Sequence, residues 1–218
     1  MEVRFQTKEE SNFEQREAFF RLSPRDRIYK FLDLSERLND VPTKFQPKVS
    51  EKFIINIQLA EKQWKQNIYQ FIELCDRYEV EMIMVGGGAV NFHGYQRHSA
   101  DVLFWLNTDP KNLNKLVIVF QKMGYEIEKF PSQVESKEQN ISIKFSPADL
   151  NLELITSFHL GKSFDEAFKE SEIVHINKIK IFKWRVLNLA DLIESKKRSA
   201  RPKDLLDIQQ LKEINNME

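Results

Sequence analysis

The chain has 218 residues, of which 41% are hydrophobic, a size and composition that support one substantial core and exclude a disordered chain. Its 33 basic and 33 acidic residues cancel, so net charge does not indicate a nucleic-acid or membrane partner. No apolar run approaches the roughly 18 residues that span a bilayer, and residues 1–10 are mostly polar. The single cysteine, Cys75, cannot form an internal disulfide and is expected in the core. These features favour a cytoplasmic protein without a membrane partner.

Two helices are expected in the first 50 residues, beginning with residues 11–22, whose apolar side chains lie near one face. Ser23 then predicts an N-cap, with Pro24 at the first helical position. The prolines of residues 41–50 predict a linker. This N-terminal helical extension is expected either to pack on the core or to act as a lid or docking arm for a protein partner.

The middle of the chain is rich in expected strands, and helices crowd both ends, which predicts an α+β fold. We divide it into the extension and linker (1–50), a core (51–160) and a C-terminal hairpin with helices that pack on the core (161–218). The expected elements after the linker are, in order, strand 53–57, helix 59–78, strand 81–85, helix 89–92, strand 101–106, helix 110–123, two or three strands among 125–130, 141–145 and 152–155, helix 163–169, hairpin strands 173–176 and 178–182, and helices 188–197 and 202–214.

Three consecutive glycines, Gly86, Gly87 and Gly88, stand between an expected strand and an expected helix. Glycine allows close approach of the backbone to a ligand, and amides at a helix start favour anions, so a phosphate would suit this turn. A tight turn that needs positive φ is the alternative.

Arg97, Ser99 and Asp101 follow, and Asp101 opens the next expected strand. A basic group, a hydroxyl and a carboxylate near the glycine turn suit a phosphate with a divalent cation, with Asp101 as an oxygen ligand of Mg²⁺. Taken singly, Arg97 could be a surface residue and Asp101 a cap.

Residues 85–101 read Val-Gly-Gly-Gly-Ala-Val-Asn-Phe-His-Gly-Tyr-Gln-Arg-His-Ser-Ala-Asp. This order resembles the signature of the nucleotidyltransferase fold, the DNA polymerase β-like superfamily, in particular the small bacterial branch that includes AbiEii-type toxins. The resemblance covers roughly residues 60–212 and implies a small mixed sheet flanked by helices. It also implies a nucleoside triphosphate bound with Mg²⁺ and transfer of a nucleoside monophosphate to a hydroxyl. A role in a toxin–antitoxin-type system is implied by the family alone.

The same resemblance assigns roles to individual residues. Asp101 becomes the first metal ligand, and Glu153 takes the place of the third carboxylate, where it would bind metal or act as base. Lys196 and Lys203 match the family's closing basic pattern and are expected to contact the nucleotide. The expected nucleotide contacts are Gly86, Gly87, Gly88, Arg97, Ser99, Lys196 and Lys203.

The sequence departs from the family at Leu103, which stands where a second aspartate is usual, two residues after Asp101 on the same strand face. Two Mg²⁺ ions need anionic oxygens shared between them, so we expect at most a single ion, held by Asp101 and Glu153. Two hypotheses follow: a nucleotidyltransferase, or a catalytically inactive relative that binds nucleotide or a protein partner.

Other polar residues receive simpler interpretations. His93 is expected to be a structural hydrogen-bonding residue, and His98 to be exposed or to face substrate. Five cations between residues 196 and 203 could be a solvated helix end or a wall that contacts phosphates. Asp204 and Asp207 are expected to pair with these cations rather than bind metal.

Overall fold

The computed structural model describes residues 8–39, 53–56, 64–99, 101–144, 151–177 and 181–217. The linker expected at 41–50 lies outside these residues.

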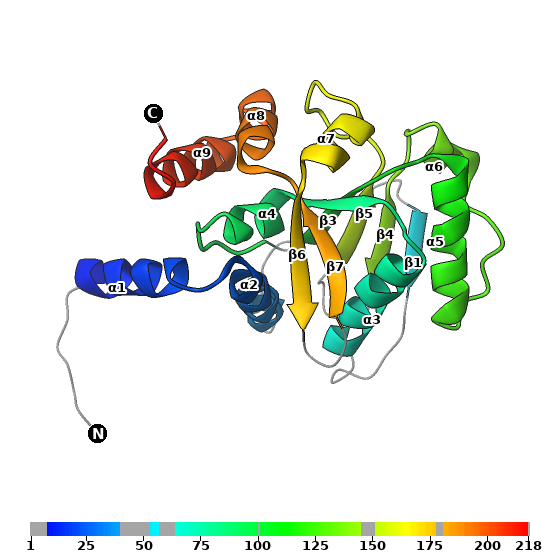
Figure 1. Cartoon of the computed structure of the whole chain (residues 1–218), viewed down its shortest axis with the longest axis horizontal. Helices are drawn as coiled ribbons and strands as arrows, with labels where there is room; N and C mark the ends of the chain where they lie inside the picture. The colour runs from blue at the N-terminus through cyan, green and yellow to red at the C-terminus, as the bar shows by residue number, and fades with distance from the viewer. Residues whose placement is uncertain are drawn as a thin grey trace.

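A seven-stranded mixed sheet forms the centre of the molecule, in the order β1-β4-β5-β3-β2-β7-β6 (Figure 1). Strands β2 and β3 are antiparallel, whereas β3–β5, β2–β7 and β1–β4 are parallel. The fold is therefore α+β, as the order of elements predicts. The strands are β1 (Phe53–Asn56), β2 (Met82–Val85), β3 (Asp101–Leu106), β4 (Ile141–Lys144), β5 (Asn151–Ile155), β6 (Glu172–Asn177) and β7 (Ile181–Val186).

Helices cover both faces of the sheet and gather at one end of it (Figure 1). The helix Pro110–Lys122 begins where expected, because Asp109 accepts a hydrogen bond from Lys111 N at 2.8 Å. The helices are α1 (Lys8–Phe20), α2 (Pro24–Asn39), α3 (Trp64–Arg77), α4 (Gly86–Phe92), α5 (Pro110–Lys122), α6 (Ser132–Glu135), α7 (Phe164–Glu170), α8 (Leu189–Ser199) and α9 (Pro202–Ile214).

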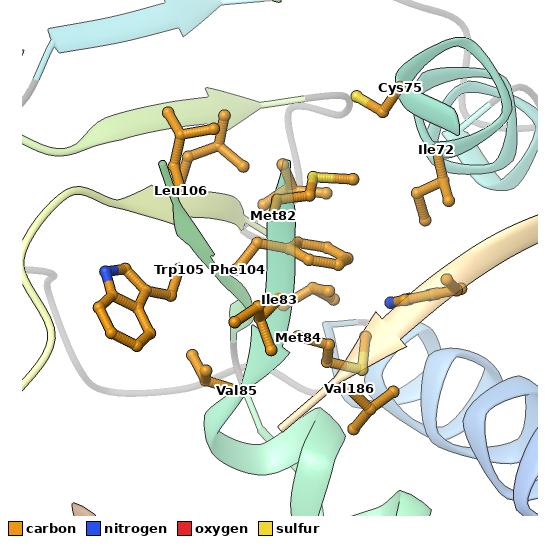
Figure 2. Close-up of a cluster of buried hydrophobic side chains, with 14 of the residues drawn as sticks. Ile72, Cys75, Met82, Ile83, Met84, Val85, Phe104, Trp105, Leu106 and Val186 are labelled. Carbon is orange, nitrogen blue, oxygen red and sulfur yellow. The ribbon is translucent and has the colours of Figure 1, made fainter. Parts of the chain in front are cut away.

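The main core lies between the sheet and helices α3 and α5. Figure 2 shows Met82, Phe104 and Met84 on the side of β2 and β3 that faces α3, and Ile72 and Cys75 of α3 on that same side. Burial raises the pKa of the Cys75 thiol well above its usual range, so this residue is the core hydrophobe that the sequence predicts. Alternation along the strands sends the neighbouring side chains to the opposite face.

The N-terminal helices differ in how far they are buried. Asp26 N donates to Ser23 Oγ at 3.2 Å, which confirms the predicted cap of α2. Ile28 and Phe31 of α2 are fully buried, so this helix packs on the core. On α1 the Phe13 side chain is 59% exposed, so the first helix leaves apolar surface uncovered.

Residues 125–130, expected as one of two or three strands after α5, do not form a strand. The rings of Tyr125 and Phe130 instead lie edge-on to Phe120 of α5, each with its centroid 6.1 Å away. Gln121 Nε2 also donates to Ile127 O at 2.8 Å. This segment therefore buries its apolar side chains against a helix without a strand partner, which a period-two pattern cannot reveal.

Candidate functional site

The sequence predicts a turn at the glycine triplet and a helix that begins after it. In the structure the three glycines instead form the first turn of α4. Gly86 has φ +62°, and a Cβ at this position would lie 2.8 Å from Leu103 Cδ1. The left-handed backbone therefore favours glycine here, and the Leu103 side chain would have to shift to admit a Cβ. Val85, the residue before the triplet, points to the side of the sheet opposite α3 (Figure 2).

The segment 97–99 folds back over the second glycine. A Cβ on Gly87 would lie 2.6 Å from Ser99 Cβ and 3.2 Å from Arg97 Nη2. The structure therefore brings together Gly87, Arg97 and Ser99, as the sequence predicts. Gly88 packs instead against Met84, whose Sδ would lie 2.6 Å from an added Cβ.

Asn91 fixes this arrangement and was missed by the sequence analysis. Its side-chain amide donates to Gly87 O at 2.9 Å and to Arg97 O at 2.6 Å, and its oxygen accepts from Arg97 N at 3.3 Å. Asn91 is completely buried. The available signal was a polar residue between Val90 and Phe92 in a short apolar helix, because a buried amide needs partners.

Asp101 and Glu153 lie on adjacent parallel strands. In the register, Asp101 is opposite Asn151 and Leu103 is opposite Glu153, so the two carboxylates are diagonal neighbours on one face of the sheet. Glu153 is only 8% exposed, and its Oε1 accepts from Asn140 Nδ2 at 3.2 Å.

A Mg²⁺ site fits these residues poorly. Asp101 and Glu153 both have further interaction partners within the chain. Within the described segments, no cluster of three or more His, Cys, Asp or Glu side chains is placed to hold a metal ion. Leu103, which stands between them on the same face, supplies no oxygen ligand, and Mg²⁺ requires oxygen ligands.

A hollow of about 370 Å³ opens beside the glycine turn. Gly86 and Leu103 form one wall, and Lys196 and Arg201 lie in the wall that α8 and α9 contribute. Leu103, not Asp101, is the β3 residue that lines it, so the carboxylate expected here lies beside the hollow rather than in its wall. His159, Ser157 and Ser199 also line this hollow.

Lys196 is the centre of a buried ion-pair network. Its Nζ lies 3.2 Å from Asp204 Oδ1 and 2.5 Å from Asp207 Oδ2, which confirms the pairing expected for these aspartates. Arg201 Nε approaches Asp204 Oδ2 at 2.6 Å, and Arg97 Nε lies 3.4 Å from Asp207 Oδ1. The network therefore connects the segment after the glycine turn to α8 and α9.

Cations outnumber carboxylates in this network. Burial tends to raise the pKa of Asp204, but hydrogen bonds from Arg201 and Lys196 lower it below its usual value. Lys203 on α9 has a lowered pKa, first because its ammonium is partly desolvated and then because Arg201 and Arg97 repel it. The local positive charge is thus only partly compensated.

His93 is structural, as predicted. Its Nε2 lies 2.8 Å from Leu187 O, and burial lowers its pKa to about 4, with Arg27 contributing less. His98 is exposed.

A larger hollow, of about 470 Å³, lies beside β2 and β7. These two strands are paired only at Met84 and Val186, so they are separate where Met82 and Trp184 line the hollow. Three acidic and three basic side chains line it, so it has no cationic excess to attract a phosphate. We therefore assign the candidate site to the hollow beside the glycine turn, although it is the smaller of the two.

No family model, curated protein or solved structure matches the chain. Among the described residues, none of the helices is both long enough and apolar enough to cross a membrane.

Proposed function

We propose that this protein binds the phosphate tail of a nucleoside triphosphate in the hollow between Gly86 and Lys196, in a nucleotidyltransferase-like fold. The observation that carries the proposal is the placement of Lys196 and Arg201 across the hollow from a glycine that no other residue can replace without strain. Guanidinium and ammonium groups are the side chains that bind phosphate most strongly.

In this proposal the protein binds nucleotide with little or no turnover. Leu103 occupies the wall where a nucleotidyltransferase would carry a metal-binding carboxylate, and Glu153 is buried against Asn140. The protein partner expected at the N-terminal extension stays a prediction, to which the exposed Phe13 of α1 adds an apolar surface.

Transfer of a nucleoside monophosphate to a hydroxyl acceptor is the second candidate. It is favoured by the position of Asp101 and Glu153 on one face of adjacent strands. Asp101 and Glu153 would then be the catalytic carboxylates.

Calorimetric titration with ATP, GTP, CTP and UTP tests the proposal. Arg201→Gln should weaken binding about tenfold, which corresponds to one charge-assisted contact. Lys197→Gln is the matched control, because it removes the same charge from an exposed position on α8 that does not line the hollow. Equal weakening by both variants, or no binding by the natural chain, would refute the proposal.

Incubation with α-labelled nucleotide then separates the two candidates. Label transferred to the protein or to an added acceptor by the natural chain would establish turnover. We expect none.

A further inference from the structure

One wall of the hollow is aliphatic at the point where a metal-dependent site needs oxygen ligands. Val85 and Leu103 are register partners on β2 and β3, and Ile155 continues the same wall from β5. Such a wall offers no oxygen ligand to a divalent cation, which binds proteins through oxygen ligands. Of the carboxylates near the hollow, Asp204 lines it but is already paired with Lys196 and Arg201. Glu153, which is bonded to Asn140, and Asp101 fall outside the lining residues.

The opposite wall supplies positive charge directly. Lys196 and Arg201 line the hollow, and Arg97 joins them through Asp207, whose Oδ1 lies 3.4 Å from Arg97 Nε. Lys203 lies in the first turn of α9, two residues after Arg201, which caps that helix. Against these four cations stand two carboxylates, Asp204 and Asp207, which are 1% and 2% exposed at the side chain and already paired. Within this network the cations therefore exceed the carboxylates by two, and such a local excess of positive charge favours a polyphosphate.

We propose that the hollow binds its nucleotide without a divalent cation, with the cluster of Arg97, Lys196, Arg201 and Lys203 supplying the positive charge that Mg²⁺ supplies in metal-dependent sites. This inference rests on the proposed function and specifies it further. The aliphatic wall then faces the uncharged part of the ligand.

The experiment is a calorimetric titration of ATP into the full chain, once in excess EDTA and once in excess MgCl2. We expect a dissociation constant in EDTA that is equal to, or lower than, the value in MgCl2, because free ATP carries more negative charge than its Mg²⁺ complex. Binding in MgCl2 alone would overturn the inference and leave the proposed function standing. Binding in neither condition would overturn the proposed function.

A pair of variants at Leu103 provides the second test. Leu103→Asp places a carboxylate in the wall, in register with Glu153. In EDTA it should weaken ATP binding about tenfold relative to Leu103→Asn, which removes the isobutyl group without adding charge. MgCl2 should recover this loss in Leu103→Asp alone.

Thermal unfolding without ligand checks that both variants are folded. Should Leu103→Asp unfold, Lys203→Gln serves instead, because Lys203 is an exposed member of the cluster. This variant should weaken ATP binding in EDTA several-fold, whereas Lys197→Gln should not. An effect of Lys203→Gln that appears only in MgCl2 would contradict the inference.

Discussion

Replacement of Lys196 by methionine tests the buried network that forms the cationic wall. The side chain of Lys196 is 6% exposed, and its two partners, Asp204 and Asp207, are exposed by 1% and 2%. Removing one partner of a buried ion pair costs about 3–5 kcal/mol, because the remaining charge is left without compensation. Since Arg201 still contacts Asp204, we expect the lower end, about 3 kcal/mol, equivalent to a fall of about 6–12 °C in Tm.

The assay is urea unfolding at pH 7 of the natural chain, Lys196→Met and Lys197→Met. The exposed Lys197 should change the free energy of unfolding by less than about 0.5 kcal/mol. Adding Asp207→Asn to Lys196→Met removes one uncompensated charge and should restore about 1–3 kcal/mol. A loss below about 1 kcal/mol for Lys196→Met would refute the reasoning.

The network also predicts a pH dependence. The pKa of Asp204 in the folded chain lies below its ordinary value of 3.8, so its ionised form stabilises the fold above that pH. This contribution is lost as pH falls through the folded pKa. The difference in stability between the natural chain and Lys196→Met should therefore narrow below about pH 4.

Three further predictions concern other positions. Gly86→Ala should lower the free energy of unfolding by about 1–2 kcal/mol, because alanine disfavours the positive φ of this residue. The new Cβ would also contact Leu103 Cδ1, so the Tm of Gly86→Ala should rise when Leu103→Ala is added. His93, whose pKa falls from 6.5 to about 4, favours the fold above pH 6.5, and this contribution is lost as pH drops toward 4. In urea unfolding the natural chain should lose about 3 kcal/mol of stability from this residue between pH 6.5 and 4, and His93→Gln should lack this loss. Equal dependence of the free energy of unfolding on pH in the two chains would contradict the prediction. Ser163→Ala should cost about 1 kcal/mol in urea unfolding, because it breaks the capping box with Glu166 at the start of α7.

The sequence predicts the elements that local chemistry determines. Ser23, Asp109, Ser163 and Asn188 each cap a helix whose start was expected within a residue or two. The failure at residues 125–130 has a tertiary cause, because Phe120 of α5 takes the place of a strand neighbour. No local pattern carries that information.

Of the residues that the sequence predicts for the site, only Gly86 and Lys196 line the hollow; the others, Gly87, Gly88, Arg97, Ser99, Asp101, Glu153 and Lys203, do not. The grouping of Gly87, Arg97 and Ser99 followed from their spacing, and Leu103 was recognised as the departure. The burial of Lys196 by Asp204 and Asp207 could be anticipated from their positions on neighbouring helices, but the placement of Leu103 rather than Asp101 in the wall depends on how the sheet meets α8 and α9. That contact joins residues far apart in the chain.

The position of the phosphates tests the central claim most directly. A crystal of the chain grown with ATP and MnCl2 locates the triphosphate by its density and Mn²⁺ by anomalous scattering. We predict a triphosphate between Gly86 and Arg201, with no manganese coordinated by Asp101 or Glu153. A triphosphate bound anywhere else on the molecule would contradict the account.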